Sequence, residues 1–301
     1  MRHIPVLKNE VLESLQLKPG DNVVDCTLGD AGHSEAMLEK ISPDGKLLGI
    51  DADAEAVLRA KRFLYRFGDR TILVRENFTN LQKIIEENKF APINAILMDL
   101  GWSSPQFAER GRGFSFQTDE PMDMRYNGKS EIETETAADV LNNYSKDDLA
   151  KIFREFGEEK FAKEIAEAIV RFRKEKKIER TVELTEIVLQ VYRIKLHTEK
   201  DVPRIGRIHP ATKVYQALRI EVNHELENLK RALPQAVEIL AKGGRLAVIT
   251  FHSLEDRIVK QYFKSNKQIK LINKKPISAT DEEIKLNPRS RSAKLRVIQK
   301  L

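Results

Sequence analysis

The sequence has one cysteine and one tryptophan among its 301 residues, and it contains no long hydrophobic run. Because Cys26 stands alone, an intrachain disulfide is excluded and a zinc site built on cysteines is disfavoured. A membrane-spanning helix needs about 18 consecutive apolar residues, which the chain lacks. Residues Met1–Pro5 also lack the apolar core of a signal peptide. We therefore expect a cytoplasmic protein with no membrane anchor and no metal centre.

The net charge of +6 is unevenly distributed along the chain. Residues 257–301 hold 13 Lys/Arg and three acidic residues, a net charge of +10, so residues 1–256 carry −4. A basic segment on a mildly acidic chain favours a polyanionic partner such as nucleic acid. The alternative is a basic surface that only faces water.

The first hundred residues alternate between short apolar segments and amphipathic segments. Such alternation is typical of right-handed βαβ units and a parallel sheet. Strands are expected at 22–28, 46–51, 71–75 and 94–100, and helices at 33–41 and 54–67. Thr79 is expected to cap a further helix.

The alternation stops after the fourth strand. Residues 101–130 are rich in Gly, Ser, Pro and Asp and predict an extended loop, and from 134 to 195 the apolar residues recur at helical spacing. The length of the chain suggests about two domains. We predict a sheet domain at 1–114 and 211–301, interrupted by an all-helical domain at 115–210.

Alternating elements return after Pro210. The pattern predicts a long helix, a second helix from Pro234 to Gly243-Gly244, a strand at 245–251 and a helix at 253–263. Two further strands, at 270–273 and 295–299, close the sheet as a hairpin with a long excursion. The chain is thus expected to form an α/β, Rossmann-like, mostly parallel sheet of seven strands.

Four features gather at the carboxyl ends of the first four strands, where doubly wound sheets bind ligands. A glycine loop, Gly29–Gly32, follows the first strand, and the next helix offers its N-terminal amides. Asp51 ends the second strand and can accept ribose hydroxyls. Phe78 follows the third strand and can stack on adenine. Asp99 ends the fourth and can accept a hydrogen bond from an amine.

Each feature also has an ordinary structural interpretation: Asp51 can cap a strand end, and Phe78 can belong to the core. The spacing G-x-x-G falls short of the full G-x-G-x-x-G fingerprint, which weakens the alternative of an NAD-dependent oxidoreductase. The convergence of four suitable groups favours an adenosine-type cofactor, with S-adenosylmethionine first.

Eight motifs follow one another along the chain: HIPVLKNEVLE (His3–Glu13), DCTLGDAGHS (Asp25–Ser34), DLGWSSPQ (Asp99–Gln106), ERGRGFSF (Glu109–Phe116), PMDMRY (Pro121–Tyr126), HPATKVYQALRIEVNHEL (His209–Leu226), ITFHSLEDRIVK (Ile249–Lys260) and NPRSRSAKLR (Asn287–Arg296). This ordered set, which spans nearly the whole chain, closely resembles the RsmH (MraW) family of bacterial 16S ribosomal RNA (cytosine-N4)-methyltransferases. The chain departs from the family pattern at Cys26 and Asp30, where glycine is usual, and at Trp102, where an aliphatic residue is usual.

The resemblance implies a class I S-adenosylmethionine-dependent methyltransferase sheet interrupted by a helical substrate-recognition domain. It implies methylation of N4 of a decoding-centre cytidine in 16S rRNA, presented within the small ribosomal subunit. Neither a monomer nor a homodimer is favoured. The family's cofactor-binding pattern maps onto Ala31, Gly32, His33, Asp51, Phe78, Asp99 and Gln106.

Methylation of an exocyclic amine needs positioning and an acceptor for the N4 hydrogens. Ser104 and Pro105 lie in a segment that loosely resembles the Asp/Asn/Ser-Pro-Pro-aromatic motif of DNA amino-methyltransferases. We hypothesise that Ser104 accepts from N4; a turn-forming Ser-Pro is the alternative. His252 either orients substrate or receives a proton, or makes a structural hydrogen bond. Cys26 is expected to be a buried apolar residue, since N4 methylation needs no covalent intermediate.

Substrate contacts are predicted in two segments. Asp123 and Arg125 are expected to shape the substrate pocket, and basic residues near the C-terminus are expected to meet RNA phosphates: these are Arg289, Arg291, Lys294 and Arg296. A non-catalytic RNA-binding factor with a vestigial cofactor site is the second alternative. Suitable residues at all four strand ends argue against it.

Overall fold

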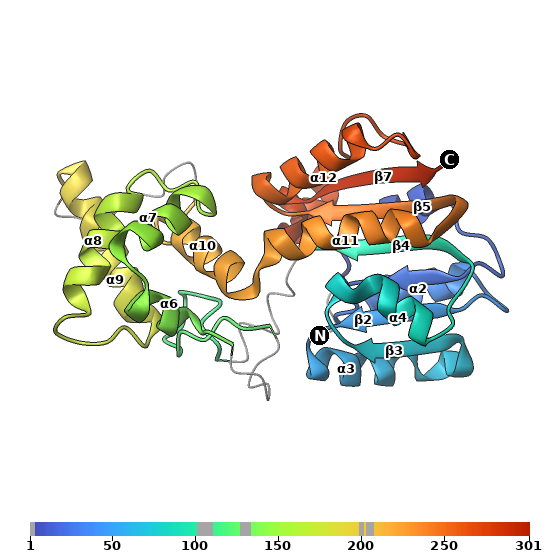
Figure 1. Cartoon of the computed structure of the whole chain (residues 1–301), viewed down its shortest axis with the longest axis horizontal. Helices are drawn as coiled ribbons and strands as arrows, with labels where there is room; N and C mark the ends of the chain where they lie inside the picture. The colour runs from blue at the N-terminus through green and yellow to red at the C-terminus, as the bar shows by residue number, and fades with distance from the viewer. Residues whose placement is uncertain (1–3, 101–110, 127–133, 199–201, 203–207) are drawn as a thin grey trace. The chain divides into compact units, whose positions relative to one another are not determined.

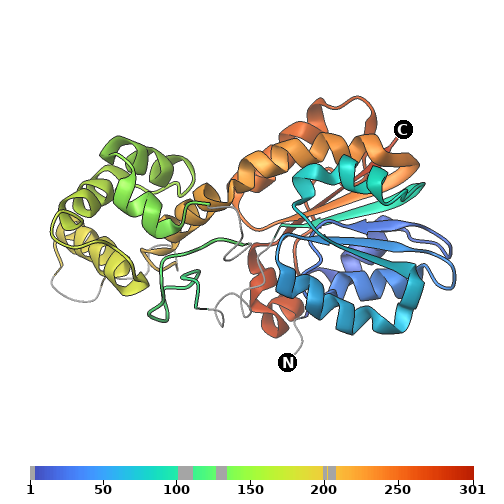
Figure 2. The same ribbon diagram turned by 60° about the horizontal axis from the view of Figure 1, so that its bottom comes forward.

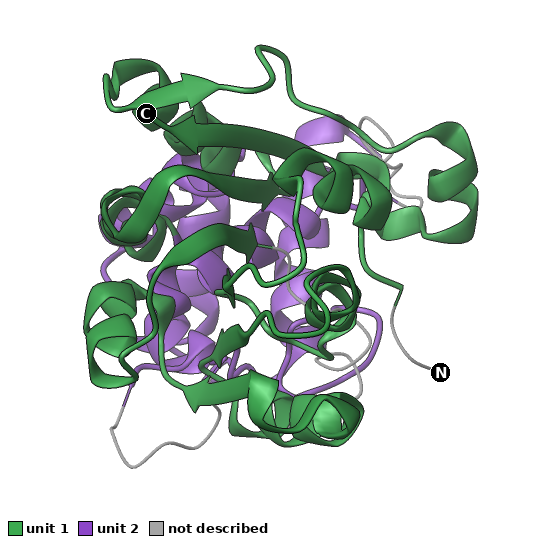
Figure 3. Ribbon diagram, turned by 90° about the vertical axis from the view of Figure 1, so that its right-hand side faces the viewer, with its two compact units in different colours: residues 1–102, 226–301 green, residues 103–225 purple. Residues whose placement is uncertain are grey.

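The computed structural model describes residues 4–100, 111–126, 134–198, 202 and 208–301, and the chain divides into two compact units (Figure 3). Unit 1 comprises Met1–Trp102 and Leu226–Leu301, and unit 2 comprises Ser103–Glu225. Unit 2 is therefore an insertion into the chain of unit 1. The helical domain predicted at 115–210 falls within unit 2, and its role in substrate recognition stays a prediction.

The described residues of unit 1 form a seven-stranded sheet in the order β3-β2-β1-β4-β5-β7-β6. The five strands β1 to β5 run parallel, whereas β7 pairs antiparallel with both β5 and β6. This mostly parallel sheet confirms the predicted class I methyltransferase fold. The strands are β1 (Val23–Asp25), β2 (Leu47–Asp51), β3 (Thr71–Arg75), β4 (Ile93–Asp99), β5 (Leu240–Thr250), β6 (Ile269–Leu271) and β7 (Lys294–Lys300).

Helices cover both faces of the sheet (Figures 1 and 2). The helical elements of the sheet unit are α1 (Lys8–Leu15), α2 (Gly32–Lys40), α3 (Ala54–Leu64), η1 (Tyr65–Arg70), η2 (Phe78–Asn80), α4 (Leu81–Glu87), α11 (Glu225–Ile239, of which all but Glu225 belongs to unit 1), α12 (Ser253–Ser265), α13 (Asp281–Leu286) and η3 (Pro288–Ser292). Apolar residues of α4, α11 and α12 pack in one core, and those of α1, α2 and α3 in another. Because both faces are covered, β1, β2 and β4 are apolar along most of their length.

Local sequence explains where these elements begin. Asp53 caps α3 by accepting a hydrogen bond from the Glu55 N–H, and Ala56, Ala60 and Leu64 form the buried face of that helix. The cap at Asp53 starts α3 shortly after β2 ends. Asp51 therefore stays at the carboxyl end of its strand, at the edge of the sheet where the strands end.

Unit 2 contains the helices α6 (Ala137–Asn143), α7 (Lys146–Glu155), α8 (Ala162–Phe172), α9 (Thr181–Leu196) and α10 (Thr212–Asn223). The predicted helical run is therefore confirmed. Thr136 and Asp139 form a capping box at α6, and Ser145 accepts from the Asp148 N–H at α7, as its sequence predicts. Phe153 is fully buried among these helices.

Three predicted helix boundaries are wrong. The helix end expected at Gly243-Gly244 is one of them, because α11 ends at Ile239 and both glycines lie in β5. The break expected at Pro234 falls instead at His224, whose left-handed backbone (φ 50°) ends α10. Pro234 lies inside α11, where the buried Leu229 and Leu233 hold the helix against the sheet despite the missing N–H. Thr79 does not cap α4: it is buried in η2, and the Asn77 side chain accepts its N–H.

Candidate active site

Three aspartates end three neighbouring strands of the sheet. Asp51 ends β2, Asp25 ends β1 and Asp99 ends β4. The crossover after β1 leads to β2 on one side, whereas β4 is followed in the sheet by β5 on the other. The connections thus change direction between β1 and β4, which is where doubly wound sheets bind ligands.

The loop after β1 is fastened to the Asp51 carboxylate. Asp51 Oδ2 accepts the Gly29 N–H at 2.8 Å, and Oδ1 accepts the Asp53 N–H at 2.9 Å. Gly29 has a φ of +49°, and among the residues that the structure describes a Cβ built there meets only the Thr27 carbonyl, at 3.9 Å. This glycine therefore keeps a left-handed turn open beside a carboxylate. Burial raises the pKa of Asp51 from 3.8 to about 6, although these two N–H groups oppose the rise.

Gly32 has a different reason to be glycine. A Cβ at this position would lie 2.5 Å from Pro5 Cγ. The Pro5 segment is itself held by the C-terminal region, since Glu283 Oε1 accepts the Leu7 N–H at 2.7 Å and Asn287 Nδ2 donates to the Ile4 carbonyl at 3.0 Å. Packing within unit 1 thus accounts for this glycine, and the sequence offered no indication of that contact.

Asp25 is the centre of a hydrogen-bond network at the site, and this role was not predicted from the sequence. Its side chain is buried, and burial raises the pKa of its carboxyl. Ser34 Oγ donates to Oδ2 at 2.6 Å, and the Thr27 N–H donates to Oδ1 at 3.1 Å. Thr27 Oγ1 in turn accepts the Asp99 N–H at 2.7 Å. An acid at the end of an apolar strand, followed by hydroxyl residues, is the pattern that indicates such a network.

The other predicted cofactor residues lie at or beside this edge. Ala31, in a left-handed conformation, precedes α2, and His33 lies in its first turn with Nε2 3.6 Å from Asp99 Oδ2. Phe78 begins η2 and is half-buried against the core. The predicted residues Ser104, Pro105 and Gln106 lie outside the described residues.

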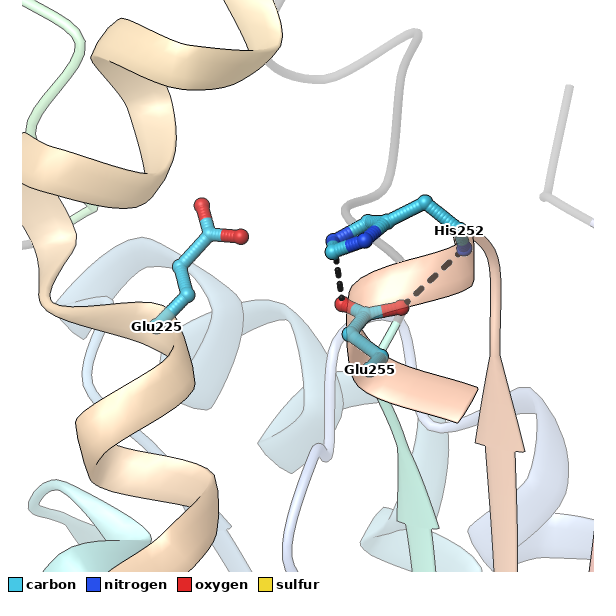
Figure 4. A group of neighbouring side chains, drawn as sticks. All are labelled: Glu225, His252 and Glu255. Atoms are coloured by element: carbon cyan, nitrogen blue, oxygen red, sulfur yellow. Dashed lines mark hydrogen bonds and ion pairs between the residues drawn. The ribbon is translucent and has the colours of Figure 1, made fainter. Parts of the chain in front are cut away.

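His252 caps α12 directly after β5 and lies beside Glu255 (Figure 4). Glu255 Oε2 accepts the N–H groups of Phe251 and His252 at 2.8 and 3.4 Å, and Oε1 lies 3.2 Å from His252 Nε2. A Glu three residues after an N-cap predicts this arrangement, yet sequence reasoning did not single out Glu255. Glu225, also drawn, belongs to unit 2, where it binds Arg219.

The four basic residues near the C-terminus have unequal environments. Arg296 is buried and donates to both oxygens of Asp256, at 2.7 and 3.2 Å, which argues against its predicted RNA contact. Lys294 lies 3.7 Å from the same carboxylate. Arg291 is exposed. Burial lowers the pKa of Arg289, whose Nη1 has no hydrogen-bond partner among the residues that the structure describes.

In unit 2, Asp123 and Arg125 bind each other. Arg125 Nε and Nη2 donate to the two oxygens of Asp123, both at 2.8 Å, and Nη1 donates to the Thr134 carbonyl. Burial raises the pKa of Asp123, but the hydrogen bonds and charge of Arg125, together with the charge of Arg112, outweigh it and lower the pKa below its ordinary value. The charge of Arg125 is therefore compensated inside its own loop.

The chain is similar to known proteins over nearly its whole length. Among the described helices, none is long and apolar enough to cross a membrane. Ribosomal RNA small subunit methyltransferase H of Dehalococcoides mccartyi is 44% identical over 318 residues, which cover 99% of this chain and 86% of that protein. The protein of the same name from Sulfurihydrogenibium sp. is 46% identical over 300 residues, 99% of this chain and 98% of that one.

A solved structure described as a putative rRNA-methylase from Clostridium thermocellum is 14% identical, with 100% of each chain covered and a TM-score of 0.49, which is too distant to bear on activity. The model of the MraW methylase family matches residues 1–301. The chain therefore belongs to the MraW methylase family.

Proposed function

We propose that this methyltransferase methylates N4 of a decoding-centre cytidine in 16S rRNA of the small ribosomal subunit. Membership of the methylase family makes S-adenosylmethionine the methyl donor. The small-subunit rRNA substrate is supported by the name of the relatives, and the N4 position by the resemblance of the chain's motifs to the family. A ribosomal substrate would place the protein in the cytoplasm.

The proposal rests on one observation: Asp51, the Gly29 loop and Asp99 all lie at the switch point of the sheet. The uncrowded backbone at Gly29, where a Cβ would meet no described atom closer than 3.9 Å, and the ionisable carboxylate beside it suit a ribose. Asp51 would accept the ribose hydroxyls, the amides of Ala31, Gly32 and His33 would face the cofactor, and Phe78 would stack on adenine. Asp99 and Gln106 would bind its remaining polar groups.

The RNA is proposed to bind through exposed or unpaired cations of unit 1 and through unit 2. Arg289, Arg291 and Lys294 would meet phosphates, because Arg291 is exposed, Lys294 lies 3.7 Å from the Asp256 carboxylate, and the Nη1 atom of Arg289, although buried, has no described partner. Ser104, Pro105 and His252 stay the proposed groups around the target amine. Asp123 and Arg125 would shape the substrate loop through their mutual pairing.

Transfer of labelled methyl from S-adenosylmethionine to small subunits that lack the modification tests the proposal. Nucleoside mass spectrometry is expected to find N4-methylcytidine. Labelling at another atom would disprove the assigned position. Cofactor binding without transfer would favour a non-catalytic RNA-binding role.

Replacing Cys26 with alanine is expected to leave turnover within about twofold of the original. Cys26 is buried, and burial raises the pKa of its thiol well above the ordinary value, so the nucleophilic thiolate does not form. The labelled-methyl assay measures the effect. A tenfold loss would show that Cys26 takes part in the reaction.

A further inference from the structure

The strands β1 and β4 pair closely and then separate at the cofactor edge. Val23, Val24 and Asp25 pair with Ala95, Ile96 and Leu97 of β4, and the Cys26 N–H still donates to the Leu97 carbonyl at 2.9 Å. Two residues later the backbones turn in opposite directions. The Leu28 N–H donates to Ile50 in β2, whereas the Leu100 N–H donates to Ile249 in β5, at 2.9 and 3.0 Å.

One side chain bridges this divergence. Thr27 Oγ1 accepts the Asp99 N–H at 2.7 Å and so extends the β1–β4 ladder by one hydrogen bond after the backbones have separated. The hydroxyl oxygen acts where a backbone carbonyl would act in a longer ladder. Thr27 thereby fixes the point at which the chain leaves β4, at the residue proposed to bind the cofactor.

The position of Thr27 is fixed in turn by Asp25. The Thr27 N–H donates to Asp25 Oδ1 at 3.1 Å, and Oγ1 lies 3.4 Å from the same oxygen. Because Oγ1 accepts from Asp99, its own proton is free to point at the carboxylate. Ser34 of α2 donates to the other oxygen at 2.6 Å. A buried carboxylate therefore links α2, the loop after β1 and the end of β4.

We infer that Thr27, held by Asp25, is a positioning residue that sets the distance between the two sides of the cofactor crevice. The inference rests on the proposed function, in which Asp51 and the Gly29 loop bind the cofactor from one side and Asp99 from the other. Thr27 touches no reacting atom. It acts through Asp99, and its loss leaves a backbone N–H without this acceptor.

The test compares Thr27→Val, which keeps the shape of the side chain and removes the hydroxyl, with Thr27→Ser, which keeps the hydroxyl. Thr27→Val is expected to weaken S-adenosylmethionine binding about tenfold, and Thr27→Ser less than threefold. Thr71→Val is the matched control, because it removes a hydroxyl that binds the Gly68 carbonyl at the start of β3. Equal affinities for Thr27→Val and the control would overturn the inference.

Double-mutant cycles separate positioning from general damage. If Thr27 acts through Asp99, Thr27→Val should weaken binding less than threefold in an Asp99→Asn background but still about tenfold in an Asp51→Asn background. Equal losses in both backgrounds would give Thr27 a merely structural role and overturn the inference.

Amide hydrogen exchange tests the same bond without cofactor. Exchange at the Asp99 N–H should quicken about tenfold or more in Thr27→Val and stay slow in Thr27→Ser. Unchanged exchange would overturn the inference even if the protein binds S-adenosylmethionine. Failure of the original protein to bind S-adenosylmethionine, with the exchange result as expected, would overturn the proposed function while the bridging role stands.

Discussion

Replacing Asp51 with asparagine is expected to weaken binding of S-adenosylmethionine by about 100-fold. The carboxylate already holds the Gly29 and Asp53 N–H groups at 2.8 and 2.9 Å and is proposed to accept the ribose hydroxyls as well. An amide offers one acceptor oxygen and turns its NH2 group toward one of these donors. Isothermal titration calorimetry measures the loss, with the exposed Asp44→Asn as the control.

The affinity should also depend on pH through Asp51. Burial raises its pKa from 3.8 to about 6, and only the ionised carboxylate can accept from two hydroxyls. Binding should therefore weaken as the pH falls through about 6, and Asp51→Asn should abolish this dependence. The stability of the free protein should depend on pH in the opposite direction. Asp51, whose pKa is raised by folding, stabilises the fold below pH 3.8, and this contribution is lost as the pH rises through about 6. Constant affinity from about pH 5 to 7 would contradict the assignment.

Replacing Arg296 with methionine is expected to lower the free energy of unfolding by about 3 kcal/mol. The two hydrogen bonds from Arg296 to Asp256 join β7 to α12, and both side chains are largely buried. Methionine fills similar space but leaves the Asp256 carboxylate with the more distant Lys294. Urea denaturation monitored by circular dichroism gives the change. A second replacement, Asp256→Asn, should restore part of the loss.

Replacing Arg291, which is exposed, is expected to have effects opposite to those of replacing the buried Arg296. Arg291→Met should leave the free energy of unfolding within about 0.5 kcal/mol and weaken RNA binding, whereas folded Arg296→Met should bind RNA normally. Burial raises the pKa of Asp256, but the hydrogen bonds and charges of Arg296 and Lys294 together outweigh it and lower the pKa. The pair therefore stabilises the fold above the ordinary Asp pKa of 3.8, and this contribution is lost as the pH falls below it. Weaker RNA binding by folded Arg296→Met would reinstate its predicted RNA contact.

The sheet could be predicted from the sequence because a parallel strand that is buried on both faces is a short, nearly continuous run of apolar residues. The runs at 46–51, 71–75 and 94–100 correspond to β2, β3 and β4 within a residue or so, and the two late strands to β6 and β7. The helix break at Pro234 was wrong because tertiary packing of α11 overrode a local rule. The helix α1 was not predicted, since its eight residues are too few to show a clear helical period.

The site was predictable only in part. The ends of apolar strands pointed to Asp51 and Asp99, because parallel strands bring their carboxyl ends to one edge. The tie from Thr27 to Asp99 joins residues 72 positions apart, and nothing in a linear pattern encodes that distance. The contact of Pro5 with Gly32 depends on how the N-terminal segment packs against the start of α2. Such contacts follow from packing rather than from periodicity.

The separation of β4 from β5 by unit 2 also dictates an order of events as the chain is synthesised. β4 (Ile93–Asp99) leaves the ribosome long before its neighbour β5 (Leu240–Thr250), so its edge stays unpaired while the whole insert is made. Glu283 and Asn287, which hold the N-terminal segment over Gly32, emerge later still. The hydrogen bonds that hold the Leu7 segment beside Gly32 therefore form only after the chain has been made as far as Asn287, and a chain that stops short of that residue lacks this support for the start of α2.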